Sequence, residues 1–252
     1  MRLASGKTEG EDAVDVRLRT IDYDQNGARF DGALILPEGA KDPVPGVLVF
    51  HGWEGRSEGQ EAFAHKLAGL GYGAFCVDLY GKGRRGTTPQ ECEALMTPLI
   101  SNRALLRERL LHVVEVASVL PELDSGRLAA IGFCFGGLCV LDLARAGAGL
   151  KGVASFHGLF TPSGLPTAAP IATKVIAFHG WDDPMVPPAD VVTLGAELTA
   201  AKADWQIHAF GGAMHAFMAP GANSPEMGIQ YHEATAHRAW TGMAGFLGEV
   251  LA

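Results

Sequence analysis

The chain has 252 residues, a length that suits one large α/β domain, and 48% of them are hydrophobic, which is enough for a substantial core. Its net charge of −8 argues against a nucleic-acid partner, because binding a polyanion requires a clustered basic surface. Residues 1–16 contain no apolar run of signal-peptide length, and no segment approaches the roughly 18 apolar residues of a membrane span. We therefore expect a cytoplasmic protein that does not associate with a membrane.

Two runs near the N-terminus, residues 14–23 and 28–37, predict a hairpin of antiparallel strands that turns at "DQNGA". Beyond it, apolar runs of strand length alternate with helical patterns. The predicted strands are 46–52, 73–81, 128–134, 152–158, 174–180 and 204–212, and the predicted helices are 61–73, 88–120, 135–146, 187–202 and 229–251. This alternation predicts an α/β fold with a mostly parallel central sheet covered by helices on both faces. No change in composition marks a linker, so residues 1–252 are expected to form a single domain.

The sequence "GFCFGG" (132–137) joins a predicted strand to a predicted helix with almost no loop. The pattern Gly132-x-Cys134-x-Gly136-Gly137 matches the nucleophile elbow, with cysteine in place of serine. Glycines at these places permit a strained turn, and the N–H groups that open the helix can donate to an oxyanion and favour a thiolate. By itself the motif leaves two interpretations open, a nucleophile or a structural cysteine buried beside a tight turn.

An acid and a histidine follow the elbow in the order that an α/β-hydrolase triad requires. "FHGWDDPMVP" offers Asp182 and Asp183, and "GGAMHAF" offers His215. We favour Asp183, because Pro184 restricts the backbone next to it, and we expect Asp182 to serve a turn or helix cap. A carboxylate on one imidazole nitrogen leaves the other to take the thiol proton.

Most of the remaining histidines are expected to be core or surface residues with an ordinary hydrogen-bond partner; the eight are His51, His65, His112, His157, His179, His208, His232 and His237. No set of them has the spacing of a zinc site, so we expect no metal.

Five stretches together make the chain similar to the dienelactone hydrolase family of the α/β-hydrolase superfamily. They are "VLVFHGWEG", "CVDLYGKG", "IGFCFGG", "FHGWDDPMVP" and "GAMHAFMAPGA". The resemblance runs from about residue 20 to the C-terminus and implies an α/β-hydrolase fold. It implies Cys134 as nucleophile, His215 as base and Asp183 as the residue that orients the base. It also implies an oxyanion hole formed by the backbone N–H groups of Trp53 and Phe135, and hydrolysis of enol-lactones or other esters without a cofactor.

The chain departs from the family pattern at two places. Family members have a glutamate directly after the first buried strand, where this chain has Gly52, with Glu54 two residues on. Glu54 is either an acid that poises the thiol or a solvated surface acid. Enzymes specialised for dienelactone hold its carboxylate with two arginines, where this chain has Ala219 and Lys82. The pocket is therefore expected to be more apolar, and its candidate substrate contacts are Tyr80, Lys82 and Phe217.

A thiol nucleophile suits activated esters, lactones and thioesters better than amides. We therefore predict a carboxylic ester hydrolase of the carboxymethylenebutenolidase type, working through a Cys-His-Asp triad and an acyl-enzyme. The alternatives are a general small-ester or thioester hydrolase and a non-catalytic binding protein on the same fold. A redox sensor is disfavoured, because Cys139 lies five residues after Cys134 and points away from it. The expected partner is a small ester or lactone, the chain being a monomer or small homo-oligomer with four free thiols.

Overall fold

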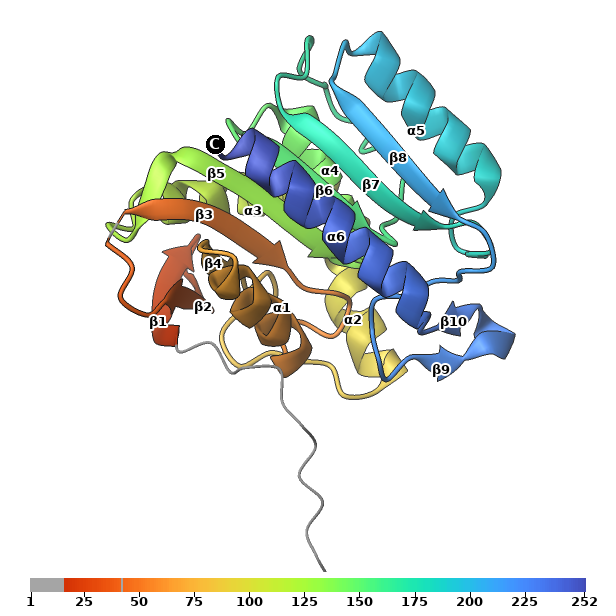
Figure 1. Cartoon of the computed structure of the whole chain (residues 1–252). Helices are drawn as coiled ribbons and strands as arrows, with labels where there is room; N and C mark the ends of the chain where they lie inside the picture. The colour runs from red at the N-terminus through yellow and green to blue at the C-terminus, as the bar shows by residue number, and fades with distance from the viewer. Residues whose placement is uncertain (1–15, 42) are drawn as a thin grey trace, which may run out of the picture.

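The computed structural model describes residues 16–41 and 43–252, and its centre is an eight-stranded sheet with the order β1-β2-β4-β3-β5-β6-β7-β8 (Figure 1). The strands are β1 (Val16–Gln25), β2 (Ala28–Pro37), β3 (Val44–Phe50), β4 (Gly73–Cys76), β5 (Leu123–Phe133), β6 (Gly152–Phe156), β7 (Lys174–Gly180) and β8 (Trp205–Phe210). β1 and β2 form the antiparallel hairpin, β2 pairs antiparallel with β4, and all other pairs are parallel. The prediction of a mostly parallel sheet with an N-terminal hairpin is confirmed.

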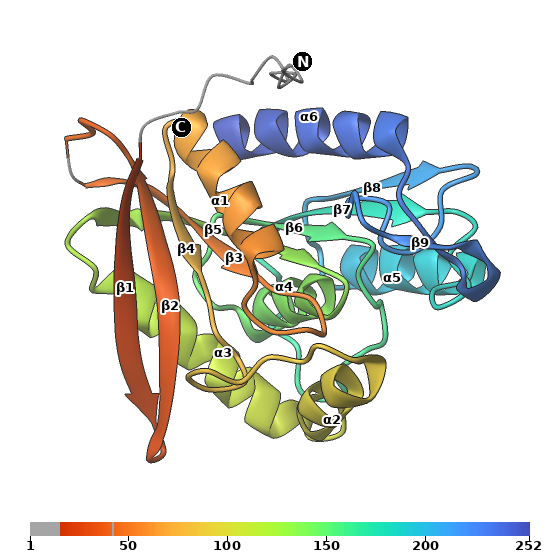
Figure 2. The same ribbon diagram turned by 90° about the horizontal axis from the view of Figure 1, so that it is seen from below.

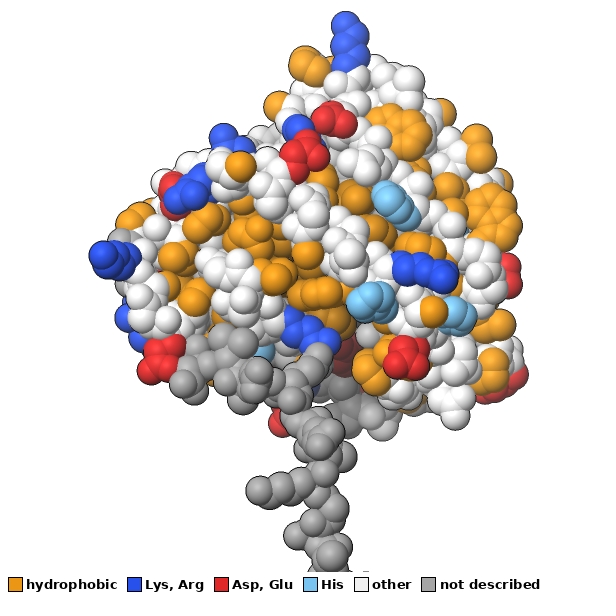
Figure 3. Space-filling model, in the orientation of Figure 1, with side chains coloured by type: hydrophobic (Ala, Val, Ile, Leu, Met, Phe, Trp, Pro, Cys, Tyr) orange, Lys and Arg blue, Asp and Glu red, His pale blue; other side chains and the backbone are white. Residues whose placement is uncertain are grey.

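Helices cover both faces of the sheet (Figure 2). One face carries α1 (Glu58–Gly69) and α6 (Glu233–Val250), and the other carries α3 (Arg103–Ser118), α4 (Phe135–Ala146) and α5 (Pro188–Ala200). Each side of the sheet has its own apolar cluster, one built with α3, α4 and α5 and the other with α1 and α6. On the face that carries α1 and α6, hydrophobic side chains remain visible at the surface (Figure 3). Phe63 and Trp240 are partly buried and pack against the apolar cluster of this side.

The expected helical region 88–120 is two helices, α2 (Pro89–Ile100) and α3. The break lies at Ser101–Asn102, because the Asn102 side chain accepts a hydrogen bond from the N–H of Leu105 and so begins a new helix. The expected strand 73–81 stops at Cys76, since Asp78 turns the chain by accepting bonds from the next backbone N–H groups.

The expected helix 229–251 begins later, at Glu233. Residues before it form a small hairpin that the sequence analysis did not predict, with β9 (Asn223–Ser224), a 3₁₀ turn (Pro225–Met227) and β10 (Ile229–Gln230). Two-residue strands carry too little periodicity to be predicted from a pattern.

Some sequence expectations lie outside the described residues. These are the first two positions of the predicted strand 14–23 and the interpretation of residues 1–15 as lacking a signal peptide. Within the described part of the chain, no helix combines the length and the hydrophobicity needed to cross a bilayer.

Candidate active site

Cys134 stands at a strained turn between β5 and α4, with φ 53° and ψ −114°. The turn depends on close backbone approach: a Cβ on Gly132 would overlap the carbonyl of Gly136, and a Cβ on Gly136 would overlap the carbonyl of Phe50. The N–H of Cys134 donates to the carbonyl oxygen of Phe156 at 3.1 Å, which fixes the turn against β6. Strain of this kind clusters at functional sites. The local geometry is that of a nucleophile elbow.

The four cysteines differ in exposure. All are free thiols, but Cys76, Cys92 and Cys139 are buried while Cys134 is partly exposed. Burial also raises the pKa of Cys76 and holds that of Cys139 well above its ordinary value, so both stay protonated. Of these thiols, Cys134 alone is positioned to react with a molecule from solution.

Asp183 and His215 form a buried pair beside this turn. His215 Nδ1 and Asp183 Oδ2 are 2.8 Å apart, and the two residues are only 3% and 2% exposed. The other carboxylate oxygen, Oδ1, accepts a hydrogen bond from the N–H of Met185 at 2.8 Å. Asp182 is exposed and lies in a turn, as one of its two expected roles requires, whereas the N-cap of α5 is Pro187.

The His215 loop is held by the small hairpin that precedes α6. The N–H of His215 donates to the carbonyl of Gly228 at 2.9 Å, and the N–H of Gln230 donates to the carbonyl of His215 at 3.0 Å. The imidazole is therefore anchored through its own backbone as well as through Asp183.

The surroundings of His215 favour its cationic form. Burial alone would lower the pKa of this imidazole, but the hydrogen bond with Asp183 and the neighbouring Cys134 thiol raise it to about 10. The second ring nitrogen, Nε2, is buried and has no hydrogen-bond partner of normal geometry among the described residues. Since Asp183 takes Nδ1, Nε2 is the nitrogen left to face the thiol.

The expected oxyanion donors lie on either side of a buried tyrosine. Phe135 is the first residue of α4, so its N–H has no acceptor within the helix. The carbonyl of Trp53 accepts a hydrogen bond from the Tyr80 hydroxyl at 3.0 Å, and the Tyr80 ring stacks on that of Phe135 at 6.0 Å. Tyr80 is only 2% exposed, so it supports both donor segments from behind and offers little surface for contact with substrate.

Glu54 is folded back over Gly52. A Cβ on Gly52 would lie 2.6 Å from Glu54 Oε2, and Glu54 Oε1 accepts a hydrogen bond from the Ser57 hydroxyl at 3.3 Å. Burial raises the pKa of the Glu54 carboxyl. Glu54 is thus a partly buried acid that occupies the space of a side chain on residue 52, and the interpretation as a solvated surface acid is wrong.

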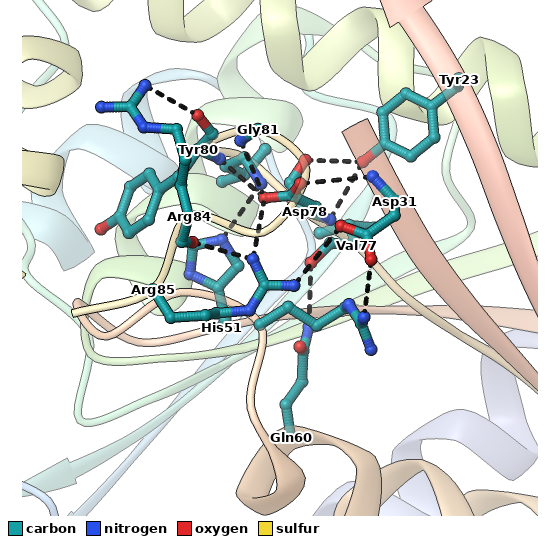
Figure 4. Close-up of polar contacts among 12 residues, drawn as sticks. Tyr23, Asp31, His51, Gln60, Val77, Asp78, Tyr80, Gly81, Arg84 and Arg85 are labelled. Carbon is teal, nitrogen blue, oxygen red and sulfur yellow. Dashed lines mark hydrogen bonds and ion pairs between the residues drawn. The ribbon is translucent and has the colours of Figure 1, made fainter. Parts of the chain in front are cut away.

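Three basic residues after β4 each contact a group of the protein, and Figure 4 shows the contacts of Arg84 and Arg85. Arg85 reaches Asp31 at 3.5 Å and Asp78 at 3.9 Å, and Arg84 donates to the carbonyl of Tyr80 at 3.1 Å. Lys82 Nζ lies 2.5 Å from Asp22 Oδ1 on the hairpin. These cations are held by groups of the protein itself.

The other buried histidines differ in whether their ring nitrogens have hydrogen-bond partners. His51 is satisfied, because its Nδ1 lies 2.6 Å from the carbonyl oxygen of Gly52 and its Nε2 accepts from the N–H of Leu79. His157 and His179 are almost completely buried, yet neither ring nitrogen of either residue has a partner in the described chain, so the expectation of ordinary partners is wrong for them.

Phe217 packs at 5.3 Å against the ring of His157 and is fully buried, behind the site. As for metals, no three potential ligands among His, Cys, Asp and Glu come together within residues 16–41 and 43–252 to hold an ion.

Comparisons with known proteins agree with this geometry. The model of the dienelactone hydrolase family matches residues 30–251. A Synechocystis sp. protein provisionally named carboxymethylenebutenolidase is 28% identical over 81% of this chain and 87% of its own. Two solved structures, m3DLH and the dienelactone hydrolase-like promiscuous phosphotriesterase P91, are 36% and 32% identical. Each alignment covers 94% of this chain and 99% of the other, with TM-scores of 0.89 and 0.88.

Proposed function

The chain belongs to the dienelactone hydrolase family and is a hydrolase, and from that premise we propose that Cys134, His215 and Asp183 form its catalytic triad. The observation that carries the proposal is the buried 2.8 Å contact between His215 and Asp183 beside a cysteine at a strained strand-to-helix turn. Because Asp183 takes Nδ1, it fixes the tautomer and leaves Nε2 for proton transfer with the thiol.

In the proposed reaction, the sulfur of Cys134 attacks the carbonyl carbon of an ester or lactone, and His215 holds the thiol proton. The tetrahedral intermediate collapses, its C–O bond breaks, and His215 gives the proton to the leaving oxygen. Water then attacks the thioester with His215 as base, which releases the acid and restores the thiol.

Two backbone donors support the proposed intermediate. The N–H of Phe135 opens α4, and the N–H of Trp53 lies in the short loop that follows β3. Tyr80 supports this arrangement through the carbonyl of Trp53. Glu54 is proposed as the acid that poises the thiol, since its carboxylate covers the Gly52 backbone in the same loop.

The proposed substrate is an uncharged ester or lactone. An anionic substrate would require a free cation, but Lys82, Arg84 and Arg85 are held by Asp22, by a carbonyl group, and by Asp31 with Asp78. Ala219 supplies no charge from the His215 loop. Separating Arg85 from Asp31 and Asp78 to bind another anion gains little free energy, because one ion pair replaces another.

The similarity to P91, named as a phosphotriesterase, favours a second candidate activity for the same thiol. A neutral phosphotriester has an electrophilic phosphorus with an activated leaving group, and it too requires no cationic anchor. Attack by Cys134 would expel the aryloxide and leave a phosphorylated sulfur for water to cleave.

The test is a substrate panel of a neutral aryl ester, a neutral lactone, a thioester, a carboxylate-bearing enol-lactone and an aryl phosphotriester. Each is run with the wild type, Cys134→Ala and Cys76→Ala, the last removing a buried core thiol. We expect turnover of the neutral acyl substrates that is lost only in Cys134→Ala. Turnover that survives this change would exclude the thiol mechanism, and no turnover of any substrate would favour a binding protein.

A further inference from the structure

His157 occupies a backbone conformation that few side chains adopt. It follows β6 directly and has φ 36°, in the left-handed region, where a residue with a Cβ is strained. Its N–H donates to the carbonyl of Phe178 at 2.9 Å, and the next residue, Gly158, packs closely against Gly137. The main chain is therefore forced to turn here, at a place where glycine or asparagine would be less strained.

The imidazole of His157 is also not explained by hydrogen bonding. The residue is 3% exposed, and neither ring nitrogen has a partner in the part of the chain that the structure describes. A buried polar group without a partner is destabilising. Burial, together with the neighbouring His215, holds the pKa of His157 well below its ordinary value, so the ring is neutral. The burial of an unpartnered polar ring therefore argues against a histidine at this position.

What the ring does provide is contact with His215. The two imidazole rings meet edge to face, with centroids 5.1 Å apart and an interplanar angle of 69°. The same ring packs against Phe217 at 5.3 Å and Phe133 at 6.1 Å, so it is itself held in place. We propose that His157 is a positioning residue, which fixes the His215 ring so that Nε2 stays directed at Cys134.

The need for such a residue follows from how His215 is held. The hydrogen bond to Asp183 restrains Nδ1, but a ring can still rock about that single contact. A rigid neighbour at van der Waals distance removes this freedom, and a misplacement of about 1 Å at a reacting group can lower a rate by on the order of 10²-fold. The inference rests on the proposed triad, and its test must separate the two.

The titratable groups that interact with His215 are Asp183, Cys134, His157 and His179. Asp183 and the thiol raise the pKa of His215, and the thiol does so only while the ring faces it. A ring that has moved away from Cys134 therefore loses protons at lower pH. The alkaline limb of the pH profile of kcat/KM reports this change, because the proposed reaction requires a protonated His215, whereas simple loss of packing does not move it.

Two variants distinguish the ring from the backbone. His157→Asn tolerates the positive φ and removes the ring, while His157→Phe keeps an aromatic ring in place. His208→Ala is the control, because it removes another imidazole of the sheet, whose ring packs against Phe178 at 5.3 Å. All are assayed with the neutral aryl ester beside Cys134→Ala, with rates corrected for the folded fraction.

We expect His157→Asn to lower kcat by about 10- to 100-fold with KM within about twofold, and to move the alkaline limb of the kcat/KM profile to lower pH. His157→Phe should stay within about threefold of wild type, and His208→Ala should keep both properties. Wild-type kcat and pH profile in His157→Asn, or an equal loss in His208→Ala, would overturn the inference. If Cys134→Ala retains activity, the proposed triad fails instead.

Discussion

The carboxylate of Glu54 lies over Gly52, with Oε2 2.6 Å from the point that a Cβ on residue 52 would occupy. The acid therefore reaches, from two residues further along the loop, the space that a side chain on residue 52 would take. Its burial raises the pKa of the carboxyl, so the protonated form persists to higher pH than in an exposed glutamate.

The position of the Glu54 carboxylate over Gly52 predicts what happens when this carboxylate is replaced by an amide. Glu54→Gln should change the pH dependence of Cys134 alkylation and lower the turnover of an aryl ester by about 10-fold, because a general acid–base contribution is typically 10²-fold or more and this residue acts indirectly. Glu58→Gln, an exposed change at the start of α1, is the control. Identical profiles for the two variants would exclude a role for Glu54.

Adjacent aspartates allow a matched test of the triad. Asp183→Asn should lower kcat by on the order of 10²- to 10⁴-fold, because an amide no longer holds the required tautomer of His215. Asp182→Asn should retain wild-type kcat, since Asp182 is exposed and removed from the hydrogen bond. Comparable steady-state rates for the two variants would contradict the assignment.

The raised pKa of His215 predicts a pH-dependent contribution to stability. The folded pKa of about 10 exceeds the ordinary value of 6.5, so protonation stabilises the folded state. The stabilisation is complete below about pH 6.5 and is lost as the pH rises through about 10. Thermal unfolding of wild type and His215→Gln from pH 6 to 11 measures it: the difference in Tm should shrink across this range. A difference that is constant with pH would be inconsistent with a protonated His215.

A single substitution on the His215 loop should change the preference of the enzyme between anionic and neutral substrates. Ala219→Arg adds a free guanidinium, and it should raise kcat/KM for a carboxylate-bearing lactone relative to a neutral ester by about 10-fold, the equivalent of one charge-assisted hydrogen bond. Ala222→Arg places the same charge further along the loop and should leave the ratio unchanged. An unaltered ratio in Ala219→Arg would mean that the substrate does not approach this loop.

The close approach of Gly136 to the carbonyl of Phe50 predicts that a larger residue at position 136 destabilises the fold. Gly136→Ala should destabilise the fold by about 1–3 kcal/mol or more, because its Cβ would overlap the carbonyl of Phe50. Gly211→Ala has open space around the new methyl group and should change the free energy of unfolding by less than about 0.5 kcal/mol. Urea unfolding of both variants measures the difference, and equal midpoints would show that the turn can relax.

Sequence patterns by themselves determined the sheet and the identity of the candidate triad. A continuous apolar run predicts a strand such as β7, and the chain order of Cys134, Asp183 and His215 is specific because each follows a strand of the parallel part of the sheet. Parallel strands end at the same edge of a sheet, so residues at their ends converge without further information.

Only the tertiary structure determined the side-chain contacts between segments that are distant in the sequence. The pairing of Lys82 with Asp22 and the fold of Glu54 over Gly52 depend on side-chain rotamers that no periodicity records. The role inferred for His157 depends on a positive φ and a ring-to-ring contact across 58 residues, which only the packing of β6 beside the His215 loop brings about. The periodicity of apolar residues in the sequence determines which face of a strand or helix a residue occupies. The side chains that it contacts are determined only when distant segments pack together in the folded protein.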